Sequence, residues 1–209
     1  GNPHYPWRGQ RRFYQVHMTI PEEIDVMGIS ILGSPLINVG FTEKFAWTHT
    51  VSNANRFTLY ELDLNDQDRK IYTYNQKRTN IKSFPIEIEV KESDDSISTE
   101  TIELHFSRFG LLLDAGVLLG DESLTGWPNR DGKVFAIRDV AMDNQRIGTT
   151  IVGMLTAKSF DQFINTIRDN LGLSFINTIA VNDQGEAFYG DYSTVPYLTD
   201  QQLQDCQPS

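Results

Sequence analysis

The sequence has 209 residues and is acidic, with 28 aspartate and glutamate residues against 18 lysine and arginine residues and a formal net charge of −10. This charge argues against nucleic acid or an anionic membrane as the main partner. No apolar run approaches the ~18 residues that a membrane-spanning helix needs, and the single cysteine, Cys206, excludes an internal disulfide. The chain opens Gly1-Asn2-Pro3-His4 without a signal segment, so we expect it to start within a longer protein or after processing.

Short extended segments dominate the first third of the chain. Alternation of apolar and polar residues predicts a strand over residues 12–20. Turn-forming residues separate four further predicted strands, at residues 24–29, 36–41, 45–51 and 57–64. Residues 36–41 are nearly all apolar, which predicts a strand covered on both faces.

A hairpin is predicted further along the chain. Residues 86–90 and 102–106 alternate strictly between apolar and polar, and the polar stretch between them contains Asp94 and Asp95. This pattern is typical of two antiparallel strands with one face in water.

Helices are predicted only late in the chain. Ser159 is a typical N-cap, and apolar residues follow from Phe160 at helical spacing up to Gly172, which we expect to end the helix. A second helix is predicted just before it, over residues 147–155. Residues 175–181 and 186–189 then return as strands. The fold class is therefore α+β, mostly antiparallel sheet with late helices.

The sequence contains none of the common short catalytic or metal-binding motifs. His17, His49 and His105 each lie within a strand pattern with no second ligand at metal spacing, so a structural role is expected for each. Cys206 has no histidine nearby, which favours a plain thiol over a nucleophile.

Two segments carry more information. Residues 2–7 combine prolines, aromatic residues and His4 in a stiff and bulky loop. A simple connector would not need such residues. Residues 45–52 read FAWTHTVS, which on periodicity alone is a core strand.

At these residues the chain resembles the β-subunit of the penicillin acylase family, most closely the acyl-homoserine lactone and aculeacin-type acylases. The resemblance lies in NPHYPWRG, RFYQVHMTIP, WTHTVS and FTLYEL, and continues through FAIRD, FINTIAVNDQGEAFY and STVPYL in the same order. It implies part of an αββα sandwich of two antiparallel sheets between helix layers.

In that family a precursor cleaves itself to expose a serine at the N-terminus of the β-subunit. The serine attacks an amide carbonyl and its own α-amine acts as base, since an α-amine has a pKa of ~7.7–8.0. By resemblance this serine precedes the NPH motif and is not in this sequence. We therefore expect the 209-residue chain by itself to be inactive.

The resemblance assigns two catalytic positions. His4 is expected beside the amine of the nucleophile. Val51 is expected to give its backbone N–H to the oxyanion hole, a role that depends on geometry and not on the side chain. The second oxyanion donor of the family, an asparagine, is expected beyond Ser209.

The resemblance also assigns an acyl-chain pocket to Tyr5, Thr50, Ile151 and Phe175. Ile151 and Phe175 stand where relatives often have tryptophan, so a deeper pocket and a preference for long acyl chains are expected, with Ile151→Trp favouring shorter ones.

No cofactor is expected. The segment Ser52-Asn53-Ala54-Asn55 lacks the carboxylates with which penicillin acylases bind calcium, so no metal is expected there. The implied partners are a small N-acyl substrate and, from the same precursor, an α-subunit and the rest of the β-subunit, in the periplasm or outside the cell. Two alternatives stay open: a non-catalytic β-rich binding module, and a β-lactam acylase.

Overall fold

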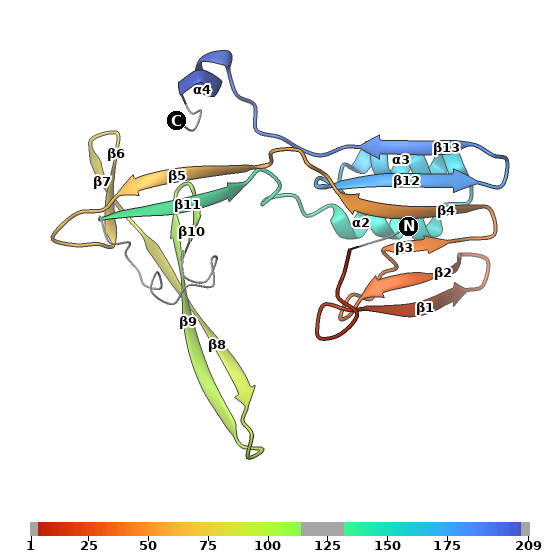
Figure 1. Cartoon of the computed structure of the whole chain (residues 1–209), viewed down its shortest axis with the longest axis horizontal. Helices are drawn as coiled ribbons and strands as arrows, with labels where there is room; N and C mark the ends of the chain where they lie inside the picture. Colours follow the sequence, from red (N-terminus) through yellow and green to blue (C-terminus); the bar gives the residue numbers. More distant parts are fainter. Residues whose placement is uncertain (1–3, 114–131, 206–209) are drawn as a thin grey trace. The chain divides into compact units, whose positions relative to one another are not determined.

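The computed structural model describes residues 4–113 and 132–205, and these form two units (Figure 1). The first unit combines Gly1–Arg56 with Ala141–Ser209, and the second is Phe57–Val140. The chain thus leaves the first unit after β4 and returns to it before α2. Nothing in the sequence had indicated this division, because no linker composition marks either crossing.

The first unit contains a six-stranded antiparallel sheet in the order β1-β2-β3-β4-β12-β13. Five of its strands match the predicted segments to within a few residues. The bounds are Phe13–Ile20 (β1), Ile24–Ile31 (β2), Val39–Phe41 (β3), Phe45–Val51 (β4), Ile176–Asn182 (β12) and Ala187–Asp191 (β13).

Two helices, α2 (Ile147–Thr156) and α3 (Phe160–Asn170), cover one face of this sheet (Figure 1). The core between sheet and helices is aromatic: Phe163 is fully buried and its ring centroid lies 5.1 Å from that of Phe45 and 5.4 Å from that of Trp47. The periodicity of α3 predicted this buried face correctly. We call the sheet face packed on α2 and α3 the covered face, and the opposite one the open face.

The ends of α3 differ in how well the sequence predicted them. Ser159 caps the helix as expected, accepting a hydrogen bond from the Gln162 N–H. The prediction that Gly172 ends it was wrong by one residue, because Leu171 takes the left-handed conformation, at φ 50°. Gly172 is required for another reason: a Cβ there would lie 2.5 Å from the Arg146 carbonyl oxygen.

The strand predicted over residues 36–41 is shorter than expected. Residues 36–38 are not part of the strand, although the Asn38 N–H still donates to the Ile29 carbonyl at 3.0 Å. Side chains bind two carbonyls of this segment: Ser30 Oγ donates to Leu36 at 2.5 Å and Trp47 Nε1 donates to Asn38 at 2.9 Å. The strand is also not covered on both faces, since Phe41 is half exposed.

Glycine lets β2 and β3 approach closely. A Cβ at Gly28 would lie 2.2 Å from the Val39 carbonyl oxygen, far inside contact distance. The fully buried Ile37 side chain fills the space above both Gly28 and Gly40.

The second unit has a five-stranded sheet in the order β5-β11-β10-β9-β8 and a separate two-stranded hairpin. Its core contains the fully buried Tyr72, whose hydroxyl accepts a hydrogen bond from the Arg108 N–H at 3.1 Å. The strands of the sheet are Phe57–Asp63 (β5), Lys82–Lys91 (β8), Ile97–Ser107 (β9), Gly110–Leu112 (β10) and Lys133–Asp139 (β11).

The two-stranded hairpin joins Ile71–Tyr74 (β6) to Lys77–Asn80 (β7). Its turn residues, Asn75 and Gln76, both have positive φ, 47° and 61°. This geometry matches the right-handed twist of a two-residue hairpin.

Strands β8 and β9 form a long ribbon that corrects another expectation. The sequence predicted one face in water, but the apolar face is open as well: Phe84 is 51% exposed and Ile102 46% exposed. The register places seven apolar side chains on that face, Phe84, Ile86, Ile88, Val90, Ile102, Leu104 and Phe106. We call it the apolar face of the ribbon.

The last helix is α4 (Asp200–Asp205). Of the helices in residues 4–113 and 132–205, none has the length and apolar character to cross a membrane.

Candidate functional site

The candidate site is the end of β4, where several of the expected residues come together. Val51 is the last residue of the strand and is 75% exposed. Thr50, just before it, is exposed and points to the open face of the sheet, because Trp47 and Phe45 point to the covered face.

The register directs the Val51 N–H away from β12. Ser52 N donates to the Phe175 carbonyl at 3.0 Å, so Ser52 and Phe175 form a hydrogen-bonded pair. Such pairs alternate along an antiparallel ladder. Val51, opposite Ile176, therefore occupies a position without ladder bonds to β12. On its other side β3 pairs with β4 only at Trp47 and Ala46, which leaves the end of β4 beyond that pairing.

A polar cluster fixes this strand end from β12 and β13. Asn177 Nδ2 donates to Thr50 Oγ1 at 3.0 Å and to the Val51 carbonyl at 3.3 Å. The Tyr189 hydroxyl in turn donates to Asn177 Oδ1 at 3.1 Å. Three strands thus contribute to one network on the open face.

The segment after β4 is anchored by Asp191. Ser52 Oγ donates to Asp191 Oδ2 at 2.8 Å, and the Ser193 N–H donates to Oδ1 at 3.0 Å. Hydrogen bonding from Ser193 and then from Ser52 holds the pKa of the Asp191 carboxyl below its ordinary value. Asp191 is exposed and charged, so it stabilises the turn as an anion.

Phe175 borders the same strand end. It precedes β12, and the Arg56 guanidinium lies over its ring, 4.5 Å from the centroid. This cation–π contact connects the segment after β4 to the start of β12.

Tyr5 and His4 lie toward the same end of the sheet. The Tyr5 ring packs on Phe13, the first residue of β1, with centroids 4.6 Å apart. Because the strands are antiparallel, β1 begins at the end of the sheet where β4 ends. At ~4.8 Å per strand, β1 and β4 are about 14 Å apart.

Ile151 does not lie at the end of β4 with the other expected residues. It is 8% exposed and belongs to the core beneath the covered face, together with Trp47 and Met154. Thr50 and Asn177 are on the opposite face. The position of Ile151 is that of a core residue, and Ile151→Trp would overpack that core.

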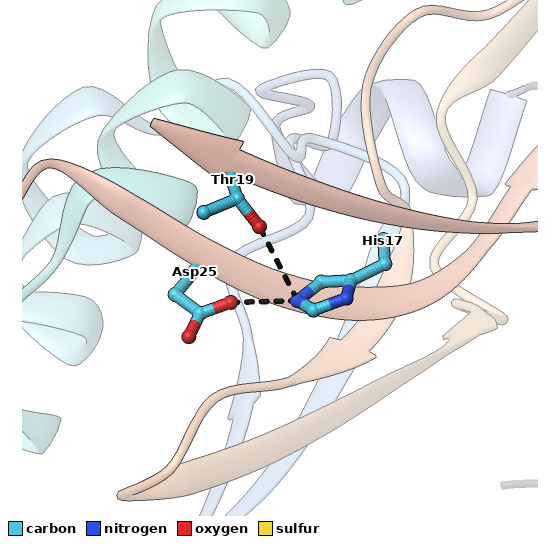
Figure 2. Close-up of polar contacts among 3 residues, drawn as sticks. All are labelled: His17, Thr19 and Asp25. Atoms are coloured by element: carbon cyan, nitrogen blue, oxygen red, sulfur yellow. Dashed lines mark hydrogen bonds and ion pairs between the residues drawn. The ribbon is translucent and has the colours of Figure 1, made fainter. Parts of the chain in front are cut away.

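None of the three strand histidines forms a catalytic relay. His49 is on the covered face, its Nδ1 lies 3.2 Å from Thr178 Oγ1, and burial lowers its pKa to about 4. His17 contacts Asp25 at 2.6 Å and Thr19 at 3.5 Å (Figure 2), but both use the same nitrogen, Nε2. A relay needs the acid and the nucleophile on different ring nitrogens.

His105 comes nearer to such an arrangement. Its Nδ1 is 2.9 Å from Ser83 Oγ and its Nε2 is 3.7 Å from Glu103 Oε2. The second distance is beyond a hydrogen bond, so Glu103 does not complete a relay through His105. In the described parts of the chain, no three His, Cys, Asp or Glu side chains gather as a metal site would require.

Four residues at this strand end were not predicted from the sequence: Asn177, Tyr189, Ser52 and Asp191. Alternation along residues 175–181 could have placed Asn177 on the same face as Phe175. Its partner Thr50 is 127 residues away in the sequence, however, and only the pairing of β4 with β12 reveals the contact.

A family model described as penicillin amidase matches residues 1–208. Acyl-homoserine lactone acylase PvdQ of Pseudomonas fluorescens strain Pf-5 is 34% identical over 209 residues, 98% of this chain and 25% of that protein. Aculeacin-A acylase of Actinoplanes utahensis is 30% identical over 208 residues, 100% of this chain and 25% of that protein. The chain thus spans about a quarter of the length of the curated relatives it matches.

Among solved structures, the chain is similar to the thermostable penicillin G acylase of Alcaligenes faecalis. The TM-score is 0.76 at 14% sequence identity, and the match covers 97% of this chain and 33% of that one. At this identity the similarity establishes the fold: antiparallel sheets with few helices, as expected from the sequence.

Proposed function

The chain belongs to the penicillin amidase family, and from this membership we propose that the complete protein hydrolyses the amide bond of N-acyl homoserine lactones or related long-chain N-acyl compounds. The named relatives are acylases, which supports amide hydrolysis. The proposed substrate class follows the relatives at 34% identity, which are acyl-homoserine lactone acylases.

The observation that carries the proposal is the end of β4. An oxyanion donor must have a backbone N–H that is not used in a ladder and that faces open space. Val51 meets the first condition with respect to β12, since it sits opposite Ile176 at a position without ladder bonds. It meets the second as an exposed strand-terminal residue.

The proposed chemistry uses an N-terminal serine that lies outside this sequence. Its hydroxyl adds to the amide carbonyl while its α-amine takes the proton, and the carbonyl oxygen becomes the oxyanion. The Val51 N–H stabilises that oxyanion. The amine then protonates the leaving nitrogen, and water releases the acyl group from the serine. In this scheme His4 helps to hold the α-amine.

The acyl chain is proposed to lie against Tyr5 and Phe175, with Thr50 between them on the open face. Aromatic side chains hold a fatty chain through buried area, at ~0.8 kcal/mol per methylene. Ile151 is left out of this pocket because its side chain is in the core. An α-subunit and the remaining β-subunit are proposed partners, in the periplasm or outside the cell.

The test is to express the full-length coding sequence and measure hydrolysis of a C4 to C14 series of N-acyl homoserine lactones. Ring-opened lactones and penicillin G serve as comparison substrates. Release of homoserine lactone and fatty acid, abolished by replacing the serine exposed at the N-terminus of the mature β-subunit with alanine, is the expected result.

Two outcomes would redirect the proposal. Cleavage of penicillin G with no turnover of any lactone would favour the β-lactam acylase. A correctly processed protein that binds N-acyl compounds but hydrolyses none would favour the non-catalytic module.

A further inference from the structure

Asn177 joins β12 to both β4 and β13 at the candidate site through side-chain hydrogen bonds. Its side chain contacts two neighbouring residues of β4, Thr50 through the hydroxyl and Val51 through the carbonyl. It is itself held by Tyr189 of β13. Neither Asn177 nor Tyr189 has a role in the proposed mechanism or in the proposed acyl pocket.

The orientation of the amide follows from its partners. The Val51 carbonyl can only accept a hydrogen bond, so the amide nitrogen of Asn177 must face it. The amide oxygen then faces Tyr189, whose hydroxyl donates to it. Both donors and the acceptor of the Asn177 amide are therefore matched.

The same geometry fixes the direction of the Thr50 proton. Because Asn177 Nδ2 donates to Thr50 Oγ1 at 3.0 Å, the hydroxyl proton of Thr50 must point elsewhere. Thr50 is exposed on the open face, and among the described residues its hydroxyl donates to no acceptor that would compete with a ligand.

We propose that Asn177, oriented by Tyr189, is a positioning residue that holds the end of β4 so that the Thr50 hydroxyl donates to a carbonyl oxygen of the substrate and the Val51 N–H faces the oxyanion. This inference rests on the proposed function of that strand end. Asn177 itself touches neither the reacting atoms nor the nucleophile. Its effect passes through Thr50 and the Val51 peptide, and Tyr189 acts only through Asn177.

The test is a double-mutant cycle in the full-length, processed protein with Asn177→Ala, Tyr189→Phe and the double variant. Tyr197→Phe is the matched control, because Tyr197 is 92% exposed and its hydroxyl has no hydrogen bond within the described residues. For each variant kcat and KM are measured on one long-chain N-acyl homoserine lactone, together with the melting temperature.

Asn177→Ala is expected to lower kcat roughly tenfold, the equivalent of about one hydrogen bond. Tyr189→Phe is expected to lower kcat less, by roughly threefold. The double variant should match Asn177→Ala, because Tyr189 has nothing left to orient. KM should change less than kcat, and the melting temperature should stay near that of the control.

Additive losses, or a kcat for Asn177→Ala equal to that of Tyr197→Phe in an active wild type, would overturn the inference and leave the proposed function standing. A fall in melting temperature that accounts for the lost activity would make Asn177 merely structural and also overturn it. A wild type inactive on all lactones would instead remove the proposed function, and this inference with it.

Discussion

Two adjacent residues of β4 have opposite surroundings. His49 points to the covered face and lies beside Thr178, whereas Thr50 points to the open face and contacts Asn177. One strand thus supplies both an inward-facing residue and an exposed residue of the candidate site, because its side chains alternate between the faces. His49 contributes to the stability of the fold, whereas its neighbour Thr50 is part of the candidate site.

His49 makes the stability of the protein depend on pH. Its pKa falls from 6.5 to about 4 in the folded chain because burial disfavours the charged ring. Between these values the unfolded chain binds a proton that the folded chain does not, so stability is full above pH 6.5 and is lost on acidification toward pH 4. The shift corresponds to about 3 kcal/mol.

The prediction is that His49→Gln, measured through melting temperatures of the full-length protein from pH 7.5 to 4.5, flattens this part of the pH dependence. Equal slopes in wild type and His49→Gln would contradict the assignment.

Phe175 sets the size of the proposed acyl pocket. A tryptophan there would keep the contact with Arg56, which lies over the ring, and would fill space that a longer chain uses. Each excluded methylene costs ~0.8 kcal/mol, about fourfold in kcat/KM. Phe175→Trp should therefore shift the optimum of the C4 to C14 series toward shorter chains. An unchanged chain-length profile would remove Phe175 from the pocket.

At the scale of the elements, the β8–β9 ribbon has two different faces. Phe84, Ile86 and Ile88 lie on one face, with Ile102 opposite Ile86 and Glu100 opposite Ile88. The acidic side chains Glu87, Glu89 and Glu103 lie on the other face. Isolated apolar residues on a surface are ordinary, but a contiguous row of this kind favours association.

The 209-residue chain alone should therefore bind a hydrophobic dye and self-associate. Ile86 and Ile102 are directly paired across the ribbon, so Ile86→Thr combined with Ile102→Thr removes the centre of the apolar face and keeps β-branched residues. Dye fluorescence and the associated fraction in sedimentation should both fall by about half or more. Glu87→Thr, on the other face, is the control. Unchanged dye binding in the double variant would show that another surface is responsible.

Local sequence patterns predicted where the helices and strands lie better than they predicted the tertiary contacts of those elements. Ser159 capped α3 as expected because a cap depends on its next few residues. The end of that helix was misplaced because Gly172 is fixed by a tertiary approach to Arg146. Likewise, no periodicity reveals the bond from Ser30 to Leu36 in the segment before β3.

The candidate site shows the same limit. Val51, Thr50 and Phe175 came from a resemblance and do lie around one strand end. Ile151 came from the same resemblance but is buried on the other side of the sheet. The direction of its side chain depends on how α2 packs against the sheet, which the resemblance did not show. Asn177 was not predicted at all, because its role arises from pairing between distant strands.

At the scale of the whole molecule, this chain is a quarter of the length of its curated relatives. In the proposed mechanism, the nucleophile and the second oxyanion donor belong to other parts of the complete protein. Since removal of one oxyanion donor alone costs ~10²–10³ in rate, the purified 209-residue chain should not hydrolyse any acyl-homoserine lactone above a heat-treated control. The processed full-length protein, assayed in parallel, should do so. Measurable turnover by the chain alone would require another nucleophile.

The insertion of the second unit between β4 and β12 has a consequence for biosynthesis. Thr50 and Asn177 are neighbours in the sheet but 127 residues apart in the sequence, so at ~5–20 residues per second β12 emerges from the ribosome roughly 6 to 25 s after β4. Throughout that interval the edge of β4 has no partner on its β12 side. The second unit, which is continuous, can fold during this wait. Of the two units, the first is therefore the one whose sheet stays incomplete during this stage of synthesis.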